Sequence, residues 1–468
     1  MPSTLLRYVS FNTSSLKEIL RTSHAFQRVF STASIAMAAL QVRQGKNIPA
    51  LETLFRAWRA SRASGFPEKG HELLWRILER TCLESGRLAP ISRNRILSEF
   101  QASSQANDIR KRFAAFPQED RSRLRFPRKP DDPERQGNLI VLKSYDAHTG
   151  ERGVLLLKYG ESFLWFSALF DLEEVAKRYA LVLEPCWAGY QDWRFLTYLG
   201  SDLNAVVLSP HPIDFDFIES LRSNLTPIRL GAGDWVDPDT FKPQGEVRNR
   251  FDVVMVSSWN PLKRHKDLLK AVAKLKQEGY EGLQVALVGS PTVWSRDEIE
   301  NMIDSYGLQH NCTIFEDIPH HSVGEVVASS RVFVLASRQE GANKALYEAL
   351  FCDTPVIAYS GHRSVNPDHV GPNVGVRFTA GRLHEGIKTV LSNEDQFSPR
   401  DWAIRNTGWP VATEKLARLL QRSELERTHP WIRPIAPKKN APNLQYAERG
   451  AYRHFEEEYR ALAALMVI

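Results

Sequence analysis

The sequence predicts an α/β protein in which a helical N-terminal extension precedes two facing, Rossmann-like doubly wound domains. Short runs rich in Val, Ile and Leu alternate with helical patterns, this alternation occurs twice, and a linker rich in glycine, proline and acids separates the two series. Such apolar runs are typical of parallel strands covered on both faces. Because ligands of these folds bind at the carboxyl ends of the strands, we expect a functional cleft between the two domains.

Length and composition agree with this organisation. A chain of 468 residues is too long for one ordinary domain. Its 43% hydrophobic and 25% charged residues are those of a globular protein, and no run approaches the roughly 20 apolar residues of a membrane-spanning helix. The 61 Lys+Arg outnumber the 55 Asp+Glu, which favours anionic partners such as nucleotides or phospholipid surfaces. Nucleic acid is not among the partners that we expect.

The cysteines and the N-terminus indicate the compartment. The four cysteines lie far apart, which argues against a disulfide framework or a zinc site and suits a reducing compartment. The apolar stretch at residues 34–40 is short and comes late for a secretory signal. We therefore expect a cytoplasmic protein, with peripheral contact at the inner face of the membrane as a further option.

The chain divides into four parts. Residues 1–135 form the helical extension, 136–235 a reduced first Rossmann-like domain, 236–425 a second one, and 426–468 a C-terminal tail and helix. In the extension, two groups of apolar residues follow helical spacing: Leu51, Leu54, Phe55, Trp58 and Leu73, Leu74, Ile77, Leu78. We expect these stripes to face a core; the alternative is a basic amphipathic surface for anionic lipid or a partner.

The segment from Val332 to Ala358 carries the most chemistry. A strand ends at Ser337, a loop delivers Glu340 and Gly341, and a helix that carries Glu348 begins near Asn343. The first amides of a helix lack internal acceptors and attract anions. A carboxylate on each side of such a phosphate site can accept hydrogen bonds from sugar hydroxyls. This pattern suits a nucleotide sugar. If the surrounding pattern were absent, we would interpret the two acids as ordinary solvated helix residues.

These residues resemble a known family. Glu340 and Glu348, in the pattern E-G-x-x-K-x-x-x-E followed by A-L-x-x-x-x-P-V-I-A, resemble the signature of the retaining family-four glycosyltransferases of GT-B fold. The resemblance implies that Glu340 holds hydroxyls of the donor sugar and Glu348 those of the ribose. Lys263, in K-R-H-K-D-L-L-K-A, is similar to the family's diphosphate-binding lysine. Glu340 and Lys263 are the candidate catalytic residues.

Further donor-binding candidates flank these positions: Gly341, Ala342, Asn343, Lys344, Arg264 and Lys266. The sequence departs from the family in two places. Ser257 and Ser258 stand where an arginine is usual, a charge that Arg264 or Lys266 can supply. Gly361-His362-Arg363-Ser364 replaces a Gly-Gly and Glu pattern.

The first domain carries weaker signals. Trp187 and Tyr190 follow a strand in an aromatic loop, with Trp193 close behind, and are candidates to stack on an acceptor sugar; such aromatics also simply pack. Residues 145–153 are the candidate for the family's glycine-rich loop. His211 reads as a loop histidine and His320 as solvated.

No metal site is expected. The pairs Asp214/Asp216 and Asp237/Asp239 form the D-x-D pattern of metal-dependent glycosyltransferases, but this pattern is common by chance. Lys263 and helix amides would instead stabilise the leaving diphosphate, so we expect no cofactor and no metal.

The predicted function is a metal-independent, retaining transfer of a sugar from a nucleotide diphosphate sugar to a glycan, lipid-linked or small-molecule acceptor, in a setting such as polysaccharide synthesis. Two alternatives stay open. One is a non-catalytic sugar-nucleotide-binding protein of the same fold, and the other is a related activity such as epimerisation or phosphorolysis.

Overall fold

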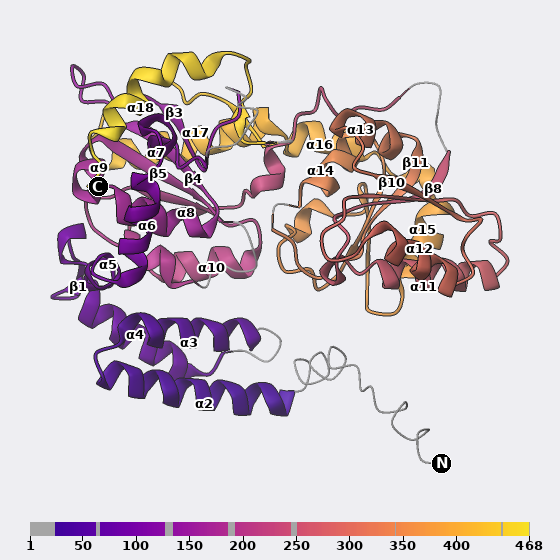
Figure 1. Cartoon of the computed structure of the whole chain (residues 1–468), viewed down its shortest axis with the longest axis horizontal. Coiled ribbons are helices and arrows are strands. Elements are labelled where there is room, and N and C mark those ends of the chain that lie inside the picture. Colours follow the sequence, from indigo (N-terminus) through magenta and orange to yellow (C-terminus); the bar gives the residue numbers. More distant parts are fainter. Residues whose placement is uncertain are drawn as a thin grey trace.

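A computed structural model describes residues 24–61, 66–126, 134–185, 192–244, 250–341, 343–440 and 443–467. Its two large β-sheets, each covered by helices, lie side by side, and helices of the N-terminal extension lie against the first of them (Figure 1). The predicted α/β class, with two α/β domains and a helical N-terminal region, is therefore confirmed. Among the described residues, no helix is both long and apolar enough to cross a bilayer.

The N-terminal extension is helical and shares a core with the first sheet. Its elements are α2 (His24–Arg43), α3 (Asn47–Ala60), α4 (Glu68–Thr81), β1 (Leu83–Glu84), β2 (Arg87–Leu88), α5 (Arg95–Gln101), α6 (Ser104–Ala114) and α7 (Gln118–Ser122). Both predicted apolar stripes lie in that core, with Leu51 and Ile77 at most 1% exposed, while Trp58 is half-buried. Burial of these side chains favours packing over a lipid-binding surface for the two stripes.

The first sheet has the order β3-β4-β5-β6-β7. Its strands are β3 (Leu139–Lys143), β4 (Gly153–Lys158), β5 (Tyr179–Glu184), β6 (Ala205–Leu208) and β7 (Leu225–Ile228). β4 to β7 pair in parallel, whereas β3 pairs with β4 antiparallel. The prediction of parallel strands throughout is wrong for β3. The connection of residues 144–152 is too short for a crossover, which needs about a dozen residues.

Strand order also decides what covers the first sheet. Because β4 to β7 follow one another in sequence, right-handed crossovers place their helices on one face. These crossover elements are α8 (Gly160–Leu169), α9 (Leu172–Arg178), η2 (Trp193–Tyr198) and α10 (Pro212–Ser220). α8 and α9 are separate helices, because Asp171 caps α9 by accepting from the amides of Glu173 and Glu174.

The C-terminal segment covers the other face of the first sheet. Its elements are α17 (Trp409–Glu426), β14 (Lys438–Lys439), β15 (Gln445–Tyr446), η7 (Ala451–Phe455) and α18 (Glu456–Ala463). From α17, Ala412, Leu416 and Leu420 pack against strand residues such as Leu156 and Val182. The predicted end of the second domain at residue 425 thus falls inside a helix that packs on the first sheet.

The second sheet has the order β10-β9-β8-β11-β12-β13, with every pairing parallel. Its strands are β8 (Phe251–Val256), β9 (Val285–Gly289), β10 (Cys312–Glu316), β11 (Ser330–Leu335), β12 (Val356–Tyr359) and β13 (Gly375–Phe378). Its helices are α11 (His265–Gln277), α12 (Arg296–Ser305), α13 (His320–Ala328), α14 (Lys344–Phe351), α15 (Leu383–Leu391) and α16 (Pro399–Asn406). This is the Rossmann order, with its switch point between β8 and β11. The alternation of apolar runs with helical patterns predicted for this domain is therefore present as parallel strands joined by helices.

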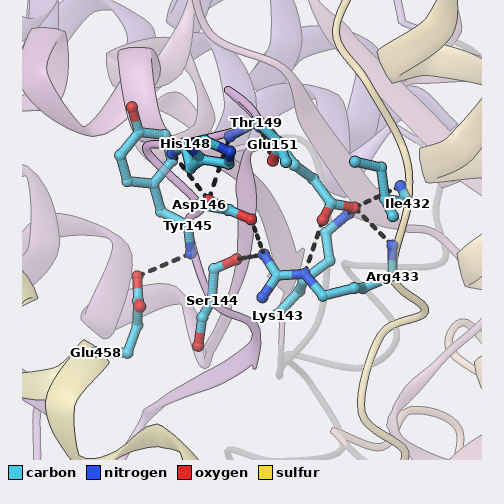
Figure 2. A network of polar contacts seen from close by, with 10 residues as sticks. All are labelled: Lys143, Ser144, Tyr145, Asp146, His148, Thr149, Glu151, Ile432, Arg433 and Glu458. Atoms are coloured by element: carbon cyan, nitrogen blue, oxygen red, sulfur yellow. Dashed lines mark hydrogen bonds and ion pairs between the residues drawn. The ribbon is translucent and has the colours of Figure 1, made fainter.

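A buried carboxylate ties the C-terminal segment to the β3–β4 connection (Figure 2). Glu151 is fully buried and accepts hydrogen bonds from Lys143 Nζ (2.9 Å), the Ile432 amide (2.7 Å), and the Arg433 amide and Nε (2.9 and 2.8 Å). Arg433 also donates to the Ser144 carbonyl at 3.0 Å. Burial alone would raise the pKa of Glu151, but these donors outweigh it and lower the pKa to about 2.

This network corrects the interpretation of residues 145–153 as a ligand-binding glycine-rich loop. Since β3 runs antiparallel to β4, the loop joins β4 at its amino end. Ligands of parallel sheets bind at the opposite, carboxyl edge. The loop therefore holds the C-terminal segment in place instead of facing the second domain.

Replacement of Glu151 by Gln should destabilise the first domain, because Lys143 would lose its buried counter-charge. We expect the melting temperature at pH 7 to fall by several degrees, whereas exposed Glu457→Gln should leave it unchanged. Because the pKa of Glu151 is depressed, its stabilising effect is complete above pH 4.5 and is lost as the pH falls toward about 2. The difference in melting temperature between Glu151→Gln and the natural protein should thus become smaller as the pH is lowered from 7 to 3. A difference that stays constant over this range would contradict this role.

Candidate functional site

Two candidate residues meet at the carboxyl edge of the second sheet. β8 and β11 are neighbours in parallel, so the loops that follow them emerge at the same edge. Lys263 lies in the loop after β8 and Glu340 in the loop after β11, and their side chains form an ion pair. The Lys263 side chain is 22% exposed and that of Glu340 is 9% exposed. Partial burial strengthens the attraction between the charges, and the pair joins residues 77 positions apart in the chain.

The local backbone brings Lys263 to this edge. It ends the short 3₁₀ helix η4 (Pro261–Lys263), which Asn260 caps by accepting from the Leu262 amide at 3.0 Å. Arg264 then adopts a left-handed conformation (φ +63°) at the start of α11. Its guanidinium pairs with Asp267 at 2.5 Å, while Lys266 is exposed. Arg264 is thus held by a neighbour on its own helix.

A buried histidine that the sequence analysis did not single out follows Lys263 two positions later. His265 is 1% exposed, and its Nε2 lies 3.2 Å from the Ser257 hydroxyl. Burial, together with the Lys263 charge, lowers the pKa of His265 to about 4, so the ring is neutral at neutral pH. A neutral ring adds no charge to the site, so Ser257 and His265 do not replace the family's arginine electrostatically.

The loop after β11 leads into α14. The Glu340 amide donates to the Ser364 hydroxyl at 3.3 Å, and Gly341 is half-buried. Ala342 lies outside the described residues. Asn343, at the start of α14, is left-handed (φ +47°) and 9% exposed, and among the described residues its side-chain amide has no hydrogen-bond partner. Lys344 donates to the Asn440 carbonyl at 3.1 Å.

Glu348 is deeper in the same region. It is 4% exposed, and its carboxylate lies 3.1 Å from Nε2 of His320, the first residue of α13. The His320 ring also packs edge-on against Phe241, with 5.1 Å between centroids. His320 is therefore not the solvated residue that the sequence suggested. A His–carboxylate contact leaves no pattern in one sequence, because its partners are 28 positions apart.

The segment Gly361-His362-Arg363-Ser364 supports the Glu340 loop. His362 Nδ1 accepts hydrogen bonds from the amides of Ser364 (3.1 Å) and Val365 (3.0 Å), and its Nε2 lies 3.4 Å from the Ser337 hydroxyl. Burial, together with the charges of His211 and Lys263, lowers the pKa of His362 to about 3. The neutral ring thus fixes the turn from which Ser364 reaches the Glu340 amide.

The first domain contacts this edge directly. Arg229, just after β7, donates to the Asn366 side chain at 2.6 Å and pairs with Asp368 at 3.0 Å. His211 caps α10 by accepting from the Ile213 amide at 3.3 Å. Its electrostatic interaction with His362 of the second domain helps to lower the pKa of that ring. His211 is therefore near the site, although we predicted it to be only a loop histidine.

A buried ion network at the carboxyl end of β5 was not foreseen. Glu184 is 1% exposed and accepts from Lys438 Nζ at 2.6 Å and from the Asn440 side chain at 3.1 and 3.2 Å. Asn440 also donates to the Ala232 carbonyl at 3.0 Å. Through Asn440, which accepts from Lys344, the C-terminal segment bridges the first sheet and α14.

The acceptor candidates have mixed outcomes. Trp187 and Tyr190 lie outside the described residues. Trp193 is 5% exposed and donates to Glu52 at 3.1 Å, so it packs in the core instead of presenting a ring to a sugar.

The two D-x-D pairs do not meet. Asp214 is buried within α10, whereas Asp237 binds the Asp239 amide, Thr240 and Lys439, each at 3.1 Å. In the part of the chain that the structure describes, no three His, Cys, Asp or Glu side chains cluster in a way that could hold a metal ion.

A comparison with family models finds a match in the second domain. Residues 236–407 match the family model described as Glycosyl transferases group 1. Over 139 residues the chain is 30% identical to MMP alpha-(1->4)-mannosyltransferase of Mycolicibacterium hassiacum, an alignment that covers 30% of this chain and 32% of that protein. The chain thus matches about a third of the length of this curated relative.

Solved structures with similarity include two of bacterial origin. Anabaena HepE in complex with UDP shares 16% identity, with 57% of this chain and 79% of that chain covered and a TM-score of 0.45. Sucrose-phosphate synthase from Thermosynechococcus elongatus shares 17% identity, with 58% and 74% covered and a TM-score of 0.45.

The His362 geometry predicts a pH effect on stability. The pKa of His362 is about 3 in the folded protein and about 6.5 when exposed, so protons bind more strongly to the unfolded chain and stability falls as the pH drops from 6.5 toward 3. In His362→Asn the side-chain oxygen can still accept from the loop amides but does not titrate. We expect this variant to lose less melting temperature between pH 7.5 and 5 than the natural protein, and exposed His321→Asn to behave as the natural protein does. An unchanged pH dependence in His362→Asn would contradict the buried neutral ring.

Proposed function

We propose that the protein is a glycosyltransferase, from the premise that its residues 236–407 match the family model described as Glycosyl transferases group 1. It moves a sugar from a nucleotide diphosphate sugar to an acceptor hydroxyl. The observation that carries the proposal is the Lys263–Glu340 ion pair at the carboxyl edge of the second sheet, beside the start of α14. A cation and an acid beside free helix amides are what a phosphate flanked by hydroxyls requires.

The diphosphate of the donor binds Lys263 and the first turn of α14. On binding, Lys263 exchanges Glu340 for the more highly charged diphosphate, and Glu340 becomes free to accept hydrogen bonds from the sugar. The buried Asn343 amide, which has no partner among the described residues, supports a polar ligand here. A buried polar group without a partner is costly, and a ligand that supplies one removes that cost.

Glu348 binds the ribose hydroxyls. Its buried carboxylate keeps acceptor capacity beyond the contact with His320, since a carboxylate has about four lone-pair sites. His320 then acts as a positioning residue that holds the carboxylate in one orientation.

The transfer proceeds with retention of configuration. The bond between the anomeric carbon and the diphosphate oxygen breaks, and a bond from that carbon to the acceptor oxygen forms on the same face. The acceptor proton passes to the leaving diphosphate, so no protein nucleophile is needed. Lys263 and the α14 amides stabilise the charge that develops on the leaving group, and this needs no metal ion. Glycan or lipid-linked acceptors of polysaccharide synthesis are the proposed setting.

The two acids should separate in their effects. We expect Glu340→Gln to lower turnover by about two orders of magnitude, because a donor–sugar hydrogen bond to a charged acceptor is lost, while nucleotide affinity changes little. Glu348→Ala should instead weaken nucleotide binding by about tenfold or more. Steady-state kinetics and calorimetric titration with nucleoside diphosphates measure the two effects, and Glu325→Gln, an exposed acid on α13, is the matched control. The reverse assignment of effects would refute these roles.

Donor hydrolysis without acceptor distinguishes the proposal from a non-catalytic binding protein. A transferase leaks some free sugar from its donor, whereas a binding protein shows affinity and no turnover.

Chelation should not abolish transfer. Because the proposed stabilisation of the leaving diphosphate comes from Lys263 and backbone amides, activity in excess EDTA should stay within about twofold of that in Mg²⁺. Loss of activity on chelation, with recovery on adding a divalent cation, would show that a metal takes part.

A further inference from the structure

A cavity of about 900 Å³ lies between the N-terminal extension and the first domain. Its walls come from α3, α4, the β1–β2 hairpin and α10, and Figure 1 shows α10 beside α3 and α4. It is separate from the Lys263–Glu340 site, since none of its lining residues belongs to the second domain. A volume in this range is ordinary for a pocket that takes a small molecule.

The interior of the cavity is apolar. Phe217 and Leu221 of α10 are 3% and 6% exposed, and the half-buried Trp58 of α3 contacts Phe217. Trp75 and Ile213 are 36% and 41% exposed, which is high for such large apolar side chains. Exposed apolar residues that border a concave apolar surface mark a binding site more often than a chance feature.

One aromatic ring of the lining is already packed against other side chains of the protein. The Trp58 ring is already covered, because it stacks on Phe66 (5.3 Å, 10°) and takes edge contacts from His71 (4.6 Å) and Phe217 (4.8 Å). The ring is therefore not available to stack on a sugar face.

Hydrogen-bonding groups lie mainly at the rim. Asp216, Ser220 and Arg222 line the cavity but are exposed. His71 is the remaining polar side chain of the lining, and burial lowers its pKa, which favours a neutral ring. A pocket with polar groups at its rim suits a chain that is apolar inside and polar at its end.

One end of the cavity faces the edge where the two domains meet. α10 starts directly after the carboxyl end of β6, with His211 as its cap and Ile213 two residues later. At that edge Arg229 contacts Asn366 of the second domain, and the charge of His211 reaches His362. The nine residues of α10 span about 13 Å, so the cavity extends away from this edge along the helix.

We propose that this pocket binds the alkyl chain of an amphipathic acceptor, whose hydroxyl then lies toward the donor site. That the ligand is an acceptor rests on the proposed function. That the pocket binds an alkyl chain does not depend on it. It names the acceptor class as a molecule with an apolar aglycone, and it gives the N-terminal extension a role in selecting the substrate.

Binding of a fluorescent alkyl probe to the full chain tests the pocket itself. Titration with 11-(dansylamino)undecanoic acid should give a saturable fluorescence increase, and Ile213→Asp should weaken binding by about tenfold or more, because a carboxylate in an apolar wall opposes the chain. Ile404→Asp is the matched control, since Ile404 is 45% exposed on α16 and far from the cavity lining. Trp75→Ala is a second variant: Trp75 is 36% exposed and lines the cavity, so loss of its ring should also weaken binding of the probe.

Several outcomes overturn the proposal: equal binding by Ile213→Asp and the natural protein, an equal loss in Ile404→Asp, or competition by a hydrophilic oligosaccharide but not by decanol. Nucleotide titration of each variant shows that the second domain is folded.

Kinetics separate this proposal from the proposed function. With octyl glycosides as acceptors, Ile213→Asp should raise KM by about tenfold, whereas KM for the same sugar without the chain should not change. Transfer that ignores both the chain and the substitution overturns the pocket proposal alone. If Ile213→Asp weakens binding of the probe but the natural protein never consumes donor, the proposed function is overturned and the pocket proposal stands.

Discussion

Lys263 and Glu340 form an ion pair at the edge of the second sheet where β8 and β11 end, and the rest of the site is arranged around it. The pair exists only because these two strands are neighbours across the switch point of the sheet, so that two loops distant in sequence share one edge. Around it, neutral buried histidines hold the loops without adding charge. A diphosphate that binds here would therefore compete with one carboxylate for Lys263, because Glu340 is the partner that the described residues provide for this lysine.

The first domain and the C-terminal segment hold this edge in position. α17 and the residues after it close the open face of the first sheet, and buried carboxylates fix them there: Glu424 pairs with Arg152 at 2.7 Å and Glu184 with Lys438 at 2.6 Å. Since Asn440 also contacts Lys344, the segment that completes the first sheet reaches the start of α14. Removing one partner of such a buried pair leaves an uncompensated charge, which makes the arrangement difficult to distort.

The second domain could be predicted from sequence, and the first only in part. Most strands of the second sheet contain short apolar runs, and Glu340, Lys263 and Glu348 stand in a recognisable order. The reversal of β3 could have been inferred from its short connection to β4, but alternation alone does not give strand direction. The roles of His320 and of the Glu184–Lys438 pair were missed because the interacting residues lie far apart in sequence, 28 and 254 positions respectively. Such contacts arise from tertiary packing and leave no local pattern.

The central claim is that Lys263 and the start of α14 bind the diphosphate of an activated sugar. The most direct test is a thermal-shift panel of UDP, GDP, ADP and their sugars, with the natural protein and with Lys263→Met, because a ligand that binds only the folded state raises the melting temperature. The account predicts that one nucleotide series raises the midpoint of the natural protein at millimolar concentration and that Lys263→Met largely abolishes the shift. No shift with any nucleotide, or an equal shift in both proteins, would contradict it.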